Sequence, residues 1–348
     1  MPYDRIASLS PFDFLTFAFS LPLFSLVVAA VVTGIVLIVA RAREDRRQRT
    51  PMTSLAVESV AVGYRREHLA VGIGAILVIV GFAIENVVRG YMLNLVDIVE
   101  WWQYATPVFV ATLSLTVALV LIVFRGSAPP EQPVLSVARR TWTTFIPRAG
   151  LLGASVTLAV LLTTTIAAGM ASSADDRGRY IYVEIAVPNE EAIGPLRPWF
   201  YGWSFGVPVL VCAAALVVVA WATLRANAIR SFRRPETVSA EQAARVQIAS
   251  GVVRIATGGM LLALAGAWRF IGRSGSFSQL TVGDAQGETY EASWRYSEFA
   301  AAGGLLAPAL EITAFILLLL VASRIGRSTS RHRTAAPVEH LPNPEAVR

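Results

Sequence analysis

The chain has 348 residues, of which 55% are hydrophobic and only 16% are charged. A soluble protein of this length would carry about a quarter charged residues, so the composition excludes an ordinary soluble domain. All 30 basic residues are arginine, and this excludes a retinal or pyridoxal Schiff base, which needs a lysine amine. The single cysteine, Cys212, excludes an intrachain disulfide.

Seven apolar runs are each long enough to cross a bilayer as a helix, which takes about 20 residues. We therefore predict an all-α polytopic membrane protein. The predicted spans are residues 19–40, 69–88, 104–124, 149–170, 203–224, 250–272 and 301–323.

Arginine is distributed unevenly between the two sides of these spans. The segments 41–68, 125–148, 225–248 and 324–348 hold 7, 4, 5 and 5 arginines, whereas 1–18, 89–103, 171–202 and 273–299 hold 1, 1, 3 and 2. Because arginine-rich loops stay in the cytoplasm, we predict an outside N-terminus and a cytoplasmic C-terminus. Exclusive use of arginine is typical of a GC-rich genome, so we expect a bacterial plasma membrane.

Two segments on the predicted outer side have strand character. One is the run 180–187, and the other is a β-hairpin in which residues 277–282 and 288–296 flank the turn 283–287. We expect these strands to pair into one small extracytoplasmic sheet, because an isolated hairpin is only marginally stable.

The spans before and after residues 149–170 resemble two copies of one three-helix unit. The matched features have the same order in both halves, which indicates a duplication. They include Gly74 and Gly81 against Gly259 and Gly266, and Pro107 with Thr112 against Pro308 with Thr313. Both copies run the same way through the membrane, so we predict a 3+1+3 parallel repeat.

This layout divides the chain into four parts. Residues 1–124 form the first repeat, 125–170 a linker, interfacial helix and connecting span, 171–323 the second repeat with the outer β element, and 324–348 a disordered cytoplasmic tail. We expect the connecting span, 149–170, to be the helix around which the rest is organised. The topology resembles that of the SWEET sugar transporters. Their Pro-Gln signature does not occur in this sequence, so the resemblance implies no role for any residue.

Charged residues inside the spans are the candidate site. Glu311 lies in the middle of the seventh span, one turn after Pro308 and two residues before Thr313. An intramembrane carboxyl is costly and is usually functional or paired, so we predict that Glu311 binds substrate or a proton; the alternative is a structural acid. Glu85 and Arg269 share a depth, which predicts an ion pair between them; the competing partner for Glu85 is Arg89, one turn on.

The sequence shows no nucleotide-binding loop, zinc-protease motif or hydrolase nucleophile motif. We therefore expect no enzyme activity, no cofactor, no metal and no nucleic-acid partner. The first hypothesis is a small-solute transporter or permease-type component, with the lipid bilayer, a small-molecule substrate and a membrane or ATPase subunit as partners. The second is a non-transporting sensor or accessory subunit of a transport or signalling complex.

Overall fold

The structure is a computed structural model that describes residues 23–47, 55–87, 100–125, 140–187, 194–277, 279–282 and 288–333. The predictions for residues 1–22, including the first predicted outer segment, lie outside the described residues. The elements are α3 (Phe24–Arg47), α4 (Leu55–Ala83), α5 (Thr106–Arg125), α6 (Arg148–Ala171), β1 (Ser173–Ala174), β2 (Tyr180–Tyr182), α7 (Trp203–Ile229), the short 3-10 helix η2 (Pro235–Thr237), α8 (Val238–Gly275), β3 (Gln279–Val282), β4 (Glu288–Glu291) and α9 (Ser297–Arg333).

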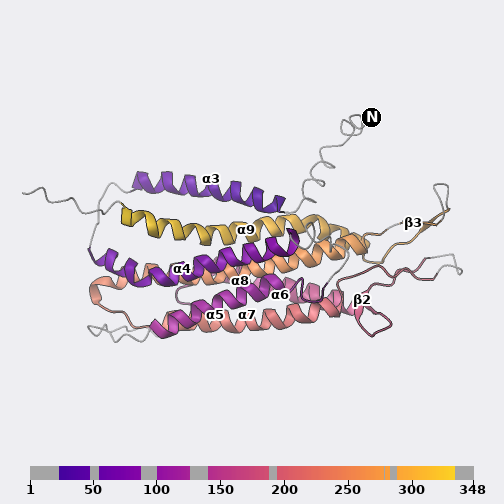
Figure 1. Ribbon diagram of the computed structural model, residues 1–348, viewed down its shortest axis with the longest axis horizontal. Coiled ribbons are helices and arrows are strands. Elements are labelled where there is room, and N and C mark those ends of the chain that lie inside the picture. The colour runs from indigo at the N-terminus through magenta and orange to yellow at the C-terminus, as the bar shows by residue number, and fades with distance from the viewer. Residues whose placement is uncertain are drawn as a thin grey trace, which may run out of the picture.

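Seven of these helices are long and apolar enough to cross a membrane, which confirms the predicted all-α membrane class. The helices lie side by side along the long axis of the molecule, and the strands project from one end (Figure 1). We call this end the β end. The opposite end holds Arg65 and Arg66 before the apolar part of α4, and Arg230 to Arg234 between α7 and α8; we call it the arginine end.

Helix α8 is the centre of the bundle. It packs against α4, α5, α6, α7 and α9, whereas α3 packs on α9 and α6 packs on α7 and α8. In α8, 89% of the most apolar window is buried, against 22% in α6. The prediction that the connecting span organises the fold was therefore wrong. Lipid tails are as apolar as leucine, so hydrophobicity alone cannot distinguish a lipid-facing helix from a central one.

Small residues let α8 and α9 approach closely at the β end. A Cβ atom added at Gly272 would lie 2.7 Å from the Cα of Gly304 and 3.0 Å from the carbonyl oxygen of Ala300. No side chain fits at that separation, so the backbones themselves are in contact. Such small-residue contacts are how helices associate in lipid, where burial of apolar surface gives no driving force.

A second hydrophobic core lies at the β end, on top of the helices. Aromatic rings dominate it: Tyr104 contacts Tyr201, Phe205 and Phe270 at centroid distances of 5.3, 5.9 and 5.6 Å. Its buried members are Ala168, Ile181, Val183, Ile185, Val187, Phe200, Tyr201, Phe205, Ala267 and Ala292.

The strands form two separate sheets in the described part of the chain. The predicted hairpin is confirmed, because β3 pairs antiparallel with β4 and Leu280 lies opposite Tyr290. Strand β2 pairs instead with β1, and isolated bridges join the β2 segment to a later segment of the chain, at Tyr182–Trp199 and Ile185–Leu196. The prediction of one shared sheet was therefore wrong: each segment found a partner close in sequence, which costs less chain entropy.

Two predictions at the arginine end also need correction. Helix α9 continues to Arg333, so residues 324–333 are helical where a disordered tail was predicted; residues 334–348 lie outside the described residues. The expected interfacial helix is a series of turns over its described part, 140–147, and Phe145 of this segment is buried.

Candidate functional site

Glu311, Arg269 and Ser25 form a polar cluster within the membrane-spanning part, which we call the Glu311 cluster. The Arg269 guanidinium donates to Glu311 Oε1 from Nη2 at 2.7 Å and from Nε at 3.3 Å. The Ser25 hydroxyl donates to Glu311 Oε2 at 2.8 Å. Both carboxylate oxygens therefore have partners, and the three side chains come from α9, α8 and α3.

The two charges differ in exposure. The side chain of Glu311 is 7% exposed, whereas that of Arg269 is 37% exposed. Residue 311 lies midway between residues 297 and 325, the limits of the apolar span of α9. The carboxylate is thus held deep in the span, and the arginine reaches it from a position that remains partly open.

The other predicted site residues do not all join this cluster. Thr313 is exposed, and its hydroxyl donates to the carbonyl of Ala309 in its own helix at 2.8 Å. Pro308 lies inside α9, which continues through it. Glu85 lies in a π-type turn that follows α4. The partner that the structure gives Arg269 is Glu311, and the Glu85–Arg269 pair stays a prediction.

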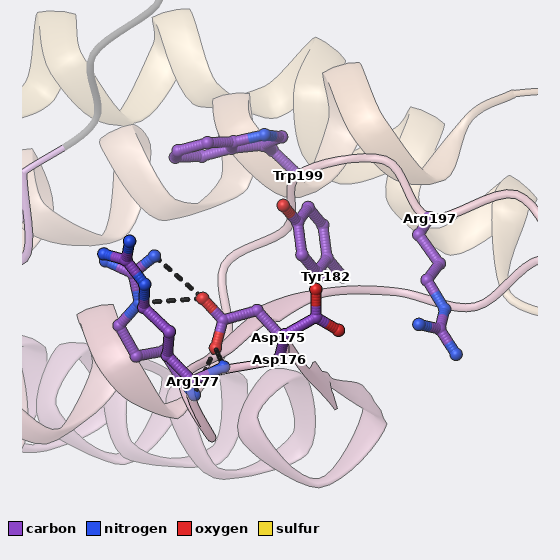
Figure 2. A pocket seen from close by; sticks show the side chains of 7 residues that line it. Asp175, Asp176, Arg177, Tyr182, Arg197 and Trp199 are labelled. Carbon is purple, nitrogen blue, oxygen red and sulfur yellow. Dashed lines mark hydrogen bonds and ion pairs between the residues drawn. The ribbon is translucent and has the colours of Figure 1, made fainter.

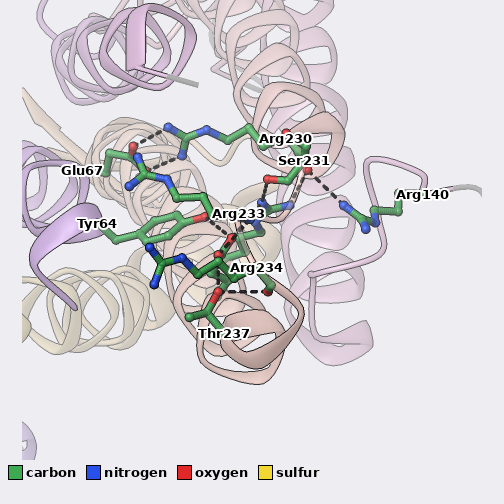
Figure 3. Close-up of polar contacts among 10 residues, drawn as sticks. Tyr64, Glu67, Arg140, Arg230, Ser231, Arg233, Arg234 and Thr237 are labelled. Carbon is green, nitrogen blue, oxygen red and sulfur yellow. Dashed lines mark hydrogen bonds and ion pairs between the residues drawn. The ribbon is translucent and has the colours of Figure 1, made fainter. Parts of the chain in front are cut away.

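A larger polar cluster, which the sequence analysis missed, lies at the arginine end around Arg245 (Figure 3). The side chain of Arg245 is completely buried. Its Nη1 donates to the carbonyl of Arg230 at 2.7 Å, its Nη2 to the carbonyl of Ser231 at 2.8 Å, and its Nε to the hydroxyl of Tyr64 at 3.2 Å. Arg245 thereby satisfies the backbone carbonyls that follow the end of α7.

Glu241, one turn before Arg245, supplies the negative charge of this cluster. Its Oε1 accepts from the hydroxyl of Thr237 at 2.8 Å and from the backbone N–H of Arg233 at 3.1 Å. Its Oε2 lies 3.5 Å from both Arg245 Nη2 and the Tyr64 hydroxyl. The carboxylate thus holds the chain reversal between α7 and α8 while it compensates the buried guanidinium.

Phe232 lies between two arginines of the same cluster. The guanidinium carbon of Arg140 is 4.0 Å from the ring centre, and that of Arg245 is 4.4 Å away. Arg140 also donates to the carbonyl of Arg230 at 3.0 Å. Desolvation lowers the pKa of Arg140 from its ordinary value, and the positive charge of Arg245 lowers it further. The guanidinium nevertheless stays protonated in proteins.

Glu67 and Arg230 complete the cluster with a bidentate ion pair, at 2.7 and 2.8 Å. The exposed fractions of the two side chains are 3% and 12%. We define the Arg245 cluster as Tyr64, Glu67, Arg140, Arg230, Ser231, Phe232, Thr237, Glu241 and Arg245. It ties α4, the 140–147 turns and the α7–α8 connection to α8. One sequence signal could have indicated it: Glu241 and Arg245 are four residues apart on the apolar face that continues with Ile248 and Val252.

An open groove of about 640 Å³ lies at the β end, beside the turn between β1 and β2 (Figure 2). Asp175 organises this turn: its Oδ1 accepts from the backbone N–H groups of Arg177 and Arg179 at 2.9 and 2.7 Å, and Arg179 Nε donates to its Oδ2 at 2.8 Å. Gly178 supplies the left-handed backbone of the turn, with φ of 76°. The groove is lined by Asp175, Asp176, Arg177, Arg179, Tyr182, Arg197 and Trp199.

The hydrogen bonds to Asp175 change its acidity. Desolvation raises the pKa of this carboxyl, but the bonds from Arg179 and Arg177 outweigh it, so the pKa lies below its ordinary value. Arg197, on the other side of the groove, pairs with Glu184 at 2.8 Å. The charges that line this groove are thus largely balanced by one another.

Within the described residues, no group of three or more histidine, cysteine or acidic side chains could hold a metal ion. Comparison with known proteins gave no family model, no curated protein and no solved structure that matches this chain. The seven apolar helices therefore define an integral, multi-pass membrane protein, and its function has to be inferred from the clusters themselves.

Proposed function

We propose that this protein is a small-solute transporter, or a permease-type component of one, in a bacterial plasma membrane. The observation that carries the proposal is the Arg269–Glu311 ion pair at 2.7 Å inside the spanning helices. Ionisable residues at such positions are expensive, and they mark substrate, ion or proton pathways more often than elsewhere.

The geometry of the Glu311 cluster suits a group that changes its partner or its charge. Arg269 is partly exposed and lies six residues before the end of α8, so its guanidinium can extend toward the headgroup region at the β end when the pair opens. Ser25 belongs to α3, which packs on α9 and not on the central helix. A displacement of the Ser25 end of α3 would release one carboxylate oxygen, and we infer that Glu311 binds a proton or a solute in this way.

The proposed topology has an outside N-terminus, a cytoplasmic C-terminus and two parallel three-helix repeats. The helix contacts support a twofold relation: α3 packs on α9 and α7 packs on α5, so the first helix of each half contacts the third helix of the other. The glycines support it less well. A Cβ atom at Gly81 would meet Val110 of α5, and one at Gly266 would meet Tyr104 in the turn before α5, whereas the twofold relation would bring Gly266 against α9. We therefore propose a repeat in the arrangement of the helices, without a residue-by-residue match between the halves.

The test is transport by the purified chain in vesicles that contain a pH-sensitive dye. A panel of sugars, amino acids and organic anions is added outside, and the solute-dependent change of internal pH is recorded. Glu311→Gln and Arg269→Gln should abolish the signal, while Arg66→Gln, at an exposed position of α4, should keep it. Full activity of Glu311→Gln at every pH would exclude Glu311 as the site.

A second function is a non-transporting sensor or accessory subunit. The observation that favours it is that both ends of α8 are covered by packed side chains. The aromatic core covers the β end, and the Arg245 cluster covers the arginine end. We propose a membrane or ATPase subunit as the partner in that case, and neither function involves catalysis, a cofactor or nucleic acid. Copurification with a membrane or ATPase subunit, together with silent vesicles, would favour this alternative.

A further inference from the structure

Arg254 occupies an unusual position on the central helix. Every residue of α8 from 251 to 265 is buried except Arg254, which is half-buried. Its guanidinium has no hydrogen-bond or ion-pair partner in the part of the chain that the structure describes. Between residues 251 and 265 the central helix therefore reaches the surface of the bundle at one point, and it does so with a permanent positive charge.

The contacts of neighbouring residues show where Arg254 points. A Cβ atom at Gly258 would lie 2.9 Å from Leu318 of α9, and one at Gly150 of α6 would lie 3.7 Å from Val253. Successive residues of a helix are rotated by about 100° around its axis. Around the axis of α8, Arg254 therefore lies about 40° from Gly258 in one direction and about 100° from Val253 in the other. Arg254 thus lies in the crevice between α9 and α6, with α8 as its floor.

This crevice is closed toward the β end. The indole N–H of Trp268 donates to the hydroxyl of Thr164 in α6 at 3.0 Å, and its ring would lie 3.5 Å from a Cβ atom at Gly303 of α9. Trp268 thus bridges α6 and α9 above Arg254. Toward the arginine end, Arg324 of α9 donates to the carbonyl of Gln247 at 2.8 Å. Gln247 lies seven residues before Arg254, about 10 Å along the helix.

We propose that the crevice between α6 and α9 binds the phosphate of an anionic membrane lipid, with Arg254 as its principal ligand. The floor is cationic at Arg254, the exposed flank of α6 is apolar, and Arg254 lies near the arginine-end limit of the predicted span 250–272. A guanidinium fork binds phosphate oxygens in pairs, and its side chain can extend along the helix toward the headgroups while its stem stays in hydrocarbon. The acyl chains then cover the apolar flanks of α6, whose outer surface is otherwise exposed, as at Leu152 and Val156.

The experiment is native mass spectrometry of the full chain extracted from vesicles of equal phosphatidylglycerol and phosphatidylcholine. The wild-type chain should retain phosphatidylglycerol in preference. Arg254→Gln should retain at least fivefold less, and Arg254→Lys, which keeps the charge but loses the fork, two- to threefold less. Arg66→Gln is the matched control, because it removes an exposed arginine from the same end of the bundle and should retain the wild-type amount.

Wild-type retention by Arg254→Gln, or an equal loss in Arg66→Gln, would overturn the proposal. A thermal-shift series in lipid-free detergent separates a lipid from a free anion. Phosphatidylglycerol should raise the unfolding temperature of the wild-type chain, and inorganic phosphate at the same concentration should not. An equal rise of the unfolding temperature with inorganic phosphate would mean that the ligand is a soluble phosphate and not a lipid. If the Arg254→Gln variant does not insert into the membrane, the lipid retention of Arg254→Lys is compared with that of the wild type instead, and wild-type retention would overturn the proposal.

Discussion

The two buried charge clusters of this protein are built differently. In the Arg245 cluster, one completely buried guanidinium has two backbone carbonyls, a tyrosine hydroxyl, a carboxylate and an aromatic ring around it. In the Glu311 cluster, one carboxylate has a partly exposed arginine and one serine from a peripheral helix. The first has many partners on rigid elements and holds the fold, whereas the second has few and can rearrange. Burial of a charge is therefore not by itself a sign of function; the two clusters differ in the number of partners and in whether those partners lie on central or peripheral helices.

The largest effect is expected for Arg245→Met. The substitution leaves the Glu241 carboxylate and two backbone carbonyls buried without their cation, which costs about 3–5 kcal/mol. The free energy of unfolding in detergent should fall by that amount, and Arg66→Met, on the exposed surface of α4, should change it little. If Arg245→Met lowered the free energy of unfolding as little as the control does, the cluster would have no structural role.

Glu67 and Arg230 should show a smaller effect with strong coupling. Glu67→Gln and Arg230→Gln should each lower the free energy of unfolding by about 2–3 kcal/mol, because each leaves one charge of a bidentate pair buried. The double substitution should cost about 1–3 kcal/mol less than the sum of the two single ones. Additive losses would mean that the two residues act independently.

Glu311→Gln should destabilise the protein less than any change in the Arg245 cluster. The amide still accepts the bond from Ser25, and the partly exposed Arg269 can extend toward the headgroup region at the β end, so we expect a loss of about 1–2 kcal/mol. Ser25→Ala should cost about 1 kcal/mol, measured by the same unfolding experiment. A loss for Glu311→Gln as large as that for Arg245→Met would place both clusters in the same structural class and weaken the transport proposal.

The smallest effect concerns the exposed pair of Asp175 and Arg179. The folded pKa of Asp175 lies below its ordinary value. The carboxylate therefore stabilises the turn at all pH values above the unfolded pKa, and this contribution disappears as the pH falls through the lower folded pKa. The protection of the Arg177 and Arg179 amides, measured as the exchange rate relative to that of an unstructured peptide at the same pH, should be high above the unfolded pKa of about 3.9 and should fall as the pH is lowered through the folded pKa. Asp175→Asn should give low protection at every pH, and Asp176→Asn should behave like the wild type.

Some features were determined by the sequence alone. Seven apolar runs specified seven spanning helices. In lipid the backbone N–H and C=O groups of such a run have no water to bind, and a helix pairs all of them within the run itself. The hairpin could also be predicted from local sequence. A turn-forming segment separates two runs with strand character, and the two strands lie within a few residues of each other along the chain. The choice of Glu311 as a residue that needs a partner also followed from its place in an apolar run.

Only the tertiary structure decided which helix is central and which charges meet. Lipid and protein interior are equally apolar, so α6 and α8 looked alike in sequence although one faces outward and the other is enclosed. The partner of Arg269 depends on the depth and rotation of three helices. Close contacts such as Gly272 against Gly304 set that geometry. The Arg245 cluster depends on it as well, because its ligands are backbone carbonyls, which every residue carries and no sequence pattern distinguishes.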